Sequence, residues 1–255
     1  MQTTTSTYRL LNIDIDNLSM DTFLQQYQKG IVVTPNVDHM MKLQRDVGFY
    51  ESYRKADYVV LDSRVILYLL RLFGVRMQGV IPGSELLPAF CHYHKDNKQI
   101  RMFLLGGMNG VAQTAAQNIN HQAGRKLVVD AYSPSMGFEK KPDEKRQIIE
   151  RINESKANVL VIGVGAPKQE KWLLQHWDEM PDIKMGMALG AALDFVAGNK
   201  KRAPRWMQKL GLEWLFRFIL EPSRMGKRYF VDDLPFFWLL LKQMRGRYQN
   251  PFDKN

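Results

Sequence analysis

The chain has 255 residues, one cysteine and a formal net charge of +10. This length fits one large domain, or one domain with an appendage, and it buries enough surface to need neither a disulfide nor a metal for stability. Cys91 has no partner within the chain, which excludes a disulfide-stapled fold and fits a reducing compartment.

Short β-rich runs alternate with amphipathic segments between residues 8 and 190. The alternation predicts βαβ units, and therefore an α/β fold with a mostly parallel sheet and helices on both of its faces. The expected strands are Tyr8–Ile13, Ile31–Val33, Tyr58–Leu61, Met102–Leu105, Leu127–Val129, Val159–Ile162 and Lys184–Ala188. The expected helices between them include Asp21–Gln28, Ser63–Phe73, Val111–His121, Glu144–Asn153 and Gln169–Trp177.

Small, polar and acidic residues follow most of these strands. The carboxyl ends of parallel strands meet at one edge of a sheet, which is where α/β proteins bind their ligands. We therefore expect the active site at that edge. The residues that follow the expected strands are Thr34, Asn36 and Asp38; Asp62 and Ser63; Gly106 and Gly107; Gly163, Gly165, Gln169 and Glu170; and Gly190 and Asp194.

Asp62 has two interpretations. A carboxylate held at a strand end is partly desolvated, which raises its pKa and suits a general base. Aspartate is also a good N-cap for the helix that begins at Ser63. Its position after Tyr58–Leu61 favours neither interpretation over the other.

Two glycine pairs also follow expected strands. The N–H groups of Gly106-Gly107 either approach a phosphate or form a tight turn before the next helix, and both interpretations stay open. The pair Gly163 and Gly165 does not complete a G-x-G-x-x-G pattern, because Lys168 occupies the third glycine position. We therefore expect no conventional dinucleotide cofactor.

Two short motifs contain residue types that bind metals. The motif Asp14-Ile15-Asp16 follows the first expected strand, and a turn with a helix cap explains it better than a metal site. The run from Cys91 to His94 lies in a helical pattern and has no second ligand cluster at the spacing of a zinc site. Neither motif predicts a metal site, so we expect no metal.

The positive charge gathers in the last fifth of the chain. Residues 199–255 hold 13 Lys and Arg against 5 Asp and Glu, a net charge of +8, whereas residues 1–198 carry +2. The same segment holds 3 of the 5 tryptophans, which a solvated basic face does not need. Such a segment is typical of proteins that bind nucleic acid, anionic lipid or a phosphorylated ligand. We therefore predict an α/β core over residues 1–198 and a basic, aromatic appendage over residues 199–255.

The appendage is expected to contain a helical stretch at Pro204–Leu220 and a second helix near Leu234–Met244. Its arginines are suited to binding a diphosphate. No run of about 18 apolar residues predicts a membrane-spanning helix, although Leu234–Leu241 is long enough to lie in a membrane interface. The N-terminal residues do not have the pattern of a secretory signal.

A set of specific motifs matches one known family in order along the chain. They are Thr34-Pro35-Asn36, Ala56-Asp57 running to Asp62, Pro82-Gly83-Ser84-Glu85-Leu86, Leu104-Leu105-Gly106-Gly107, the block from Gly163 to Trp172, Asp194 to Gly198, Arg202-Ala203-Pro204-Arg205-Trp206, Gly211 to Arg217, and Glu221-Pro222-Ser223-Arg224. Over roughly residues 10–235 the chain resembles the WecG/TagA/CpsF glycosyltransferases (glycosyltransferase family 26).

The resemblance implies a bacterial enzyme of surface-polysaccharide biosynthesis, peripheral on the cytoplasmic face of the plasma membrane. It implies a Rossmann-like core and transfer of a sugar from a UDP-sugar donor to a polyprenyl-diphosphate-linked acceptor, with inversion and without a metal or other cofactor. The appendage, residues 199–255, is then expected to contact an anionic membrane and to complete the active site. A homo-oligomer is possible, and nucleic acid is not expected as a partner.

The resemblance also implies roles for individual residues. Asp62 corresponds to the catalytic base of the family and Thr34 to its threonine at the preceding strand end. Arg217, Arg224 and either Lys227 or Arg228 correspond to its appendage cations, and we choose Arg228 as the third. The residues expected to bind substrate are Asn36, Ser84, Glu85, Gly106, Gly107, Gly163, Gly165, Gln169, Glu170 and Arg202.

The chain departs from the family pattern at three places. Ser63 stands where the family commonly has glycine, Val80-Ile81 where it has Arg-Val, and Glu85 where it has aspartate. These departures bear on the donor and acceptor more than on the type of reaction. Two other functions stay open at this point, namely a nucleic-acid-binding module that uses the basic appendage and an inactive scaffold of the same fold.

Overall fold

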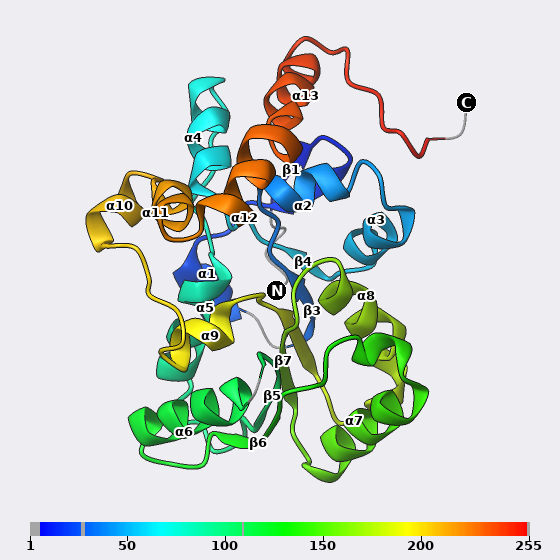
Figure 1. The fold of residues 1–255 in the computed structure, drawn as a ribbon, viewed down its shortest axis with the longest axis vertical. Helices are drawn as coiled ribbons and strands as arrows, with labels where there is room; N and C mark the ends of the chain where they lie inside the picture. The colour runs from blue at the N-terminus through cyan, green and yellow to red at the C-terminus, as the bar shows by residue number, and fades with distance from the viewer. Residues whose placement is uncertain (1–5, 27–28, 109, 254–255) are drawn as a thin grey trace.

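The computed structural model of the chain describes residues 6–26, 29–108 and 110–253. It confirms the α/β class, because six strands form one all-parallel sheet with helices packed against it, as in a Rossmann-like fold (Figure 1). The strand order is β4-β3-β8-β7-β5-β6. The strands are β3 (Gly30–Val33), β4 (Tyr58–Val59), β5 (Met102–Gly106), β6 (Val128–Tyr132), β7 (Val159–Gly163) and β8 (Met185–Ala188).

The N-terminal segment corrects one expectation. The single strand expected at Tyr8–Ile13 is two antiparallel strands, β1 (Thr7–Leu10) and β2 (Ile13–Asp16). Leu11 has a φ of 51° and reverses the chain between them. Asp14 and Asp16 therefore lie within β2 rather than after the first strand.

Nine helices of the described residues surround the sheet before the appendage begins, together with two short 3₁₀ turns. They are α1 (Met20–Gln26), α2 (Val37–Lys42), α3 (Val47–Arg54), α4 (Arg64–Leu72), α5 (Gly83–Tyr93), α6 (Val111–Ala123), α7 (Pro142–Glu154), α8 (Lys168–Gln175) and α9 (Ala192–Val196), with η1 (Phe138–Lys140) and η2 (Trp177–Glu179). The run from Cys91 to Tyr93 lies in α5, as its helical pattern predicts, and Cys91 is buried there.

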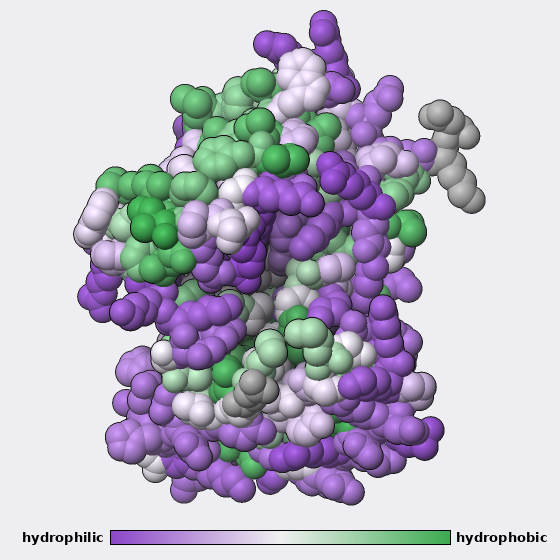
Figure 2. All heavy atoms as spheres, in the orientation of Figure 1, coloured by the Kyte–Doolittle hydropathy of each residue, from purple (hydrophilic) through white to green (hydrophobic). Residues whose placement is uncertain are grey.

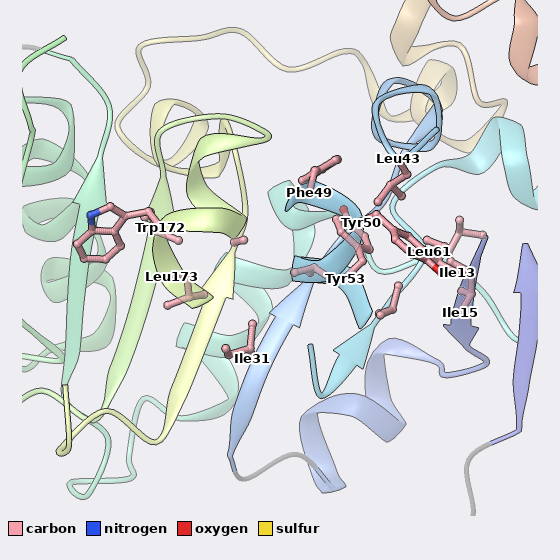
Figure 3. Close-up of a cluster of buried hydrophobic side chains, with 14 of the residues drawn as sticks. Ile13, Ile15, Ile31, Leu43, Phe49, Tyr50, Tyr53, Leu61, Trp172 and Leu173 are labelled. Atoms are coloured by element: carbon pink, nitrogen blue, oxygen red, sulfur yellow. The ribbon is translucent and has the colours of Figure 1, made fainter. Parts of the chain in front are cut away.

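Two hydrophobic cores lie on opposite faces of the sheet because side chains alternate along each strand. Ile31 and Val33 of β3 face the first core, which α3, α4, α7 and α8 cover, and Val32 faces the second, which α1, α5, α6 and α9 cover. Figure 3 shows part of the first core, where aromatic side chains of α3 pack near Ile13 and Ile15 of β2. Covering both faces leaves the strand ends as the open edge of the sheet.

Within its described residues, up to 253, the appendage contains five further helical segments. The stretch expected at Pro204–Leu220 is two helices, because Gly211, with a φ of +72°, ends the first one. Figure 1 shows the first two helices beside α4 and the last at the top of the molecule. The segments are α10 (Arg205–Lys209), α11 (Glu213–Leu220), α12 (Pro222–Lys227), the π-helix η3 (Arg228–Asp232) and α13 (Pro235–Met244).

The end of the appendage packs back on the core. Phe236 and Leu240 of α13 are buried in the first hydrophobic core. The side chain of Gln243 accepts a hydrogen bond from the N–H of Leu11 and donates one to the carbonyl of Arg9. The domain boundary near residue 198 stays a prediction.

Candidate active site

The ends of β3 and β4 lie side by side and bring together two of the predicted catalytic residues. Thr34 and Asn36 follow β3, and Asp62 follows β4. The N–H of Asp62 donates to the carbonyl of Pro35 at 3.0 Å, which joins the two strand-end loops. Thr34 is buried, and its hydroxyl donates to the carbonyl of Ala188 at 3.4 Å.

The side chain of Asp62 does not cap the helix that follows it. Ser63 is the N-cap of α4, and its hydroxyl oxygen accepts from the N–H of Ile66 at 3.3 Å. Asn36 caps α2 by accepting from the N–H of His39, which leaves its amide NH₂ to hydrogen-bond with the Asp62 carboxylate. Asp62 is therefore free of a capping role and is held by a polar partner.

The electrostatic surroundings of Asp62 raise its pKa from 3.8 to about 6. Burial is the largest cause, because it disfavours the charged carboxylate. The Arg217 guanidinium and the hydrogen bond from Asn36 lower the pKa, whereas the carboxylates of Glu213 and Glu85 raise it. A carboxyl group with this pKa is ionised at neutral pH and still accepts a proton readily, as a general base must.

A pocket of about 360 Å³ joins the core to the appendage at this point. Its core side is polar and holds Asp62. Its appendage side combines two arginines, Arg217 and Arg228, with aromatic side chains. The lining residues are Asn36, Val37, Asp62, Ser63, Arg64, Val65, Gly211, Glu213, Trp214, Arg217, Arg228, Tyr229, Phe230, Asp233, Leu234 and Phe237.

Arg228 lies near two carboxylates, one on the core and one on the appendage. Its guanidinium lies 3.6 Å from Asp38 of α2 and 3.6 Å from Asp233 of the appendage. Lys42 also contacts Asp38, at 2.7 Å. Burial raises the pKa of Asp233 to about 6, although the charge of Arg228 lowers it. Of the two alternatives for the third appendage cation, Arg228 lines the pocket, whereas Lys227 is not among its lining residues.

A second cluster of charges ties the start of the appendage to the core. Glu85 of α5 accepts from Arg64 at 2.9 Å and from Arg202 at 2.8 Å. Both arginines also lie near Glu213 of α11, at 3.7 and 3.9 Å. The predicted binding residues Glu85 and Arg202 therefore contact each other beside the pocket and do not line it. Ser84 lies in the first turn of α5, half-buried.

Gln169 and Glu170 lie at the start of α8 and are almost fully buried. The Gln169 oxygen accepts from the N–H groups of Gly165 and Gly190, which ties together the loops after β7 and β8. The Gln169 amide donates to Glu170 at 2.8 Å. Burial raises the pKa of Glu170 to about 7. This pair fixes the strand ends next to the pocket.

The remaining candidates lie away from the pocket lining. A Cβ on Gly106 would come within 2.5 Å of the Gly163 carbonyl oxygen, and the N–H of Gly107 donates to that oxygen at 3.2 Å. Gly106 and Gly107 thus form a tight turn after β5, and their binding of a phosphate stays a prediction. Arg224 is exposed on α12 and pairs with Glu221 at 2.6 Å.

Sequence reasoning missed several pocket residues. Arg64 and Glu213 carry opposite charges and lie on two helices that come together only in the folded chain. Asp233 follows another acidic residue, and two adjacent acidic residues are typical of an exposed surface. Trp214, Tyr229 and Phe237 supply the apolar wall. Only the aromatic composition of the appendage signalled this wall in advance. No cluster of three or more metal-ligating side chains occurs among the described residues.

Comparison with known proteins agrees with the family motifs. The model of the glycosyl transferase WecG/TagA/CpsF family matches residues 8–250. Two similar proteins, from Staphylococcus aureus strains MRSA252 and NCTC 8325 / PS 47, are each named N-acetylglucosaminyldiphosphoundecaprenol N-acetyl-beta-D-mannosaminyltransferase. Each is 28% identical to this chain over 237 residues, which cover 89% of both sequences.

Proposed function

Because the chain belongs to the WecG/TagA/CpsF family of glycosyl transferases, we propose that it transfers an N-acetylhexosamine from a UDP-sugar to a polyprenyl-diphosphate-linked saccharide. The product serves the synthesis of a bacterial surface polysaccharide. The relatives from Staphylococcus aureus are named for transfer of N-acetylmannosamine to N-acetylglucosaminyldiphosphoundecaprenol. That donor and acceptor are therefore the first pair to test.

The observation that carries this proposal is the pocket in which Asp62 faces two arginines. Asp62 takes the proton of an acceptor hydroxyl, and the hydroxyl oxygen forms a bond to the anomeric carbon of the donor. The bond from that carbon to the diphosphate oxygen breaks, and its electron pair leaves with UDP. A single displacement of this kind inverts the anomeric centre. The raised pKa of Asp62 supports its role as the base.

The departing diphosphate gains negative charge, which nearby cations stabilise. Arg217 and Arg228 line the pocket and are placed for this role. In this structure Arg224 pairs with Glu221 outside the pocket. We propose that a movement of α12 brings it to the diphosphate beside the other two arginines. These guanidinium groups supply the charge that a bound metal would otherwise provide, so the transfer we propose is independent of metal.

The other predicted residues support the donor and the loops around it. Thr34 and Gln169 hold the strand-end loops through bonds to the carbonyl of Ala188 and the N–H of Gly190. Glu85 and Arg202 hold the appendage against the core. We propose that the donor lies along this edge of the sheet, between the pocket and the loop after β7.

The lipid chain of the acceptor requires the enzyme to work at a membrane surface. None of the described helices is long and apolar enough to cross a membrane. We propose that the appendage docks on the anionic cytoplasmic face of the plasma membrane. Its +8 charge and the exposed tryptophans Trp206 and Trp238 support this docking.

The first test replaces the base. Asp62→Asn should lower kcat by about 10²- to 10⁴-fold, because proton transfer to a positioned base contributes that much. Binding of the UDP-sugar, measured by calorimetry, should stay near the wild-type value. Asp14→Asn, at an exposed position of β2, is the control and should keep full activity. Wild-type turnover by Asp62→Asn would remove Asp62 from this role.

A second test identifies the substrates. A panel of UDP-sugars is offered with N-acetylglucosaminyl-diphosphate on a short prenyl chain, and products are read by mass spectrometry. Transfer in the presence of EDTA is the expected result. Loss of activity that Mg²⁺ or Mn²⁺ restores would contradict metal independence, and no transfer with any donor would favour an inactive scaffold.

A further inference from the structure

A second apolar and basic segment lies outside the appendage. Residues 63–84 hold three arginines and no Asp or Glu, a net charge of +3. With the +8 of residues 199–255, these two segments carry +11, and the rest of the chain carries −1. The net positive charge of the protein therefore comes from two segments, of which the core segment contains α4.

Helix α4 has more apolar surface than the core can cover. Ile66, Leu67 and Leu70 are buried in the first core. Leu72, at the C-terminal end of the helix, is 79% exposed, and Phe73 after it is also exposed. A single large apolar side chain on a surface needs no explanation, but a contiguous patch does.

The first half of α4 contacts the appendage. The Tyr68 hydroxyl donates to the carbonyl of Lys209, and a Cβ on Gly211 would lie 3.1 Å from the Tyr68 ring. Arg64 contacts Glu213 at 3.7 Å. Figure 2 shows hydrophobic side chains gathered over α10, α11 and α4, while the opposite half of this face is hydrophilic.

The exposed apolar side chains are concentrated in the same two segments. The described residues expose 17 large hydrophobic side chains, of which 13 lie in α4 with Phe73 or in the appendage. We call these 13 residues the docking face. They are Tyr68, Leu72, Phe73, Trp206, Leu210, Trp214, Ile219, Leu220, Phe230, Val231, Leu234, Phe237 and Trp238.

We propose that the end of α4 inserts into the anionic membrane together with the appendage, so that the core supplies part of the membrane-binding surface. This inference rests on the membrane docking in the proposed function. The binding partner of the docking face is a lipid surface, because aromatic and aliphatic side chains lie there together with exposed cations. These cations include Arg71, Arg76 and Lys227. Asp62 lies two residues before α4, so the same helix connects the membrane to the base.

The test places an environment-sensitive label on the full chain. Cys91 is buried, and burial raises the pKa of its thiol to about 12, so a thiol-reactive dye marks a new surface cysteine selectively. Leu72→Cys receives the dye, and Met136→Cys, at a position equally 79% exposed outside both segments, is the control. Vesicles of phosphatidylglycerol and phosphatidylethanolamine should increase and blue-shift the emission at position 72 only.

A substitution gives a second readout. Leu72→Asp should weaken binding to these vesicles by about tenfold or more, whereas Met136→Asp should leave it unchanged. Turnover of a short-chain acceptor in detergent should stay at the wild-type level in both variants, because Leu72 does not line the pocket.

The outcomes separate the two proposals. If the wild-type chain binds vesicles but the emission of the dye at position 72 does not change, only the proposed role of α4 is overturned. If the wild-type chain does not bind vesicles, the proposed membrane docking is overturned as well. A dye signal that rises with protein concentration in the absence of vesicles would show that a second copy of the chain covers the docking face, which also overturns the inference.

Discussion

Asp62 is surrounded by groups that act on its charge in opposite directions. Burial and the carboxylate of Glu213 favour the protonated form, while Arg217 and the amide of Asn36 favour the carboxylate. The pKa of about 6 is the balance of these effects. The proposed base must be deprotonated to act, so the titration of Asp62 should appear in the pH dependence of the rate.

This balance predicts the pH dependence of transfer. The value of kcat/KM should rise with pH up to about 6 and level off above it. Arg217→Gln removes a charge that lowers the pKa of Asp62 and should move the midpoint to higher pH, whereas Glu213→Gln should move it to lower pH. Arg205→Gln, at an exposed position, is the control. Identical midpoints in all variants would assign the titration to another group.

The same raised pKa predicts an opposite effect on stability. A carboxyl group whose pKa is higher in the folded than in the unfolded chain stabilises the fold at low pH, and this contribution is lost as pH rises through about 6. Asp62→Asn should therefore raise the free energy of unfolding at pH 7.5 by about 1–2 kcal/mol. At pH 4 the difference from wild type should be small. Urea unfolding at both pH values measures this, and an inactive variant that is destabilised at pH 7.5 would indicate a structural role instead.

At the scale of the elements, side-chain periodicity located most strands and helices, but turns were harder to predict. Short apolar runs identified all six strands of the parallel sheet to within a few residues. The hairpin of β1 and β2 was missed because Leu11 reverses the chain with a positive φ, a conformation for which leucine gives no signal. Gly211 ends α10 in the same way, although there glycine is a recognisable signal.

The turn after β5 depends on one glycine. Gly106 has a φ of +142°, and any Cβ there would collide with the Gly163 carbonyl oxygen. Gly106→Ala should therefore cost about 2–3 kcal/mol of unfolding free energy. Gly124→Ala, with a φ of +64° and open space around the new Cβ, should cost only about 1 kcal/mol. Chemical denaturation compares the two, and equal losses would show that the contact with Gly163 contributes nothing.

At the scale of the whole molecule, the sequence predicted the strand-end half of the pocket and left the other half incomplete. Asn36 and Asp62 follow directly from the rule that ligands bind at the carboxyl ends of parallel strands. Trp214, Tyr229 and Asp233 are more than 150 residues away along the chain, and only the packing of the appendage brings them to Asp62. No local pattern encodes that contact. Arg217 and Arg228 were instead predicted from the resemblance to the family.

The appendage is predicted to contribute to global stability and not only to docking. Phe236 is fully buried against the first core, so Phe236→Ala should cost about 3–5 kcal/mol of unfolding free energy. The neighbouring Phe237 is partly exposed, and Phe237→Ala should cost much less. Urea titrations of the two variants provide the comparison. Equal, small losses would indicate that α13 is docked only loosely.

The two hydrogen bonds between Gln243 and the N-terminal hairpin join residues 232 and 234 positions apart in the chain. Contacts of such sequence separation form late, because the intervening chain must be ordered first. Until α13 reaches the hairpin, the pocket around Asp62 lacks the part of its wall that Phe237 supplies. Closing the pocket therefore requires the first strands and the last helix of the described chain to meet.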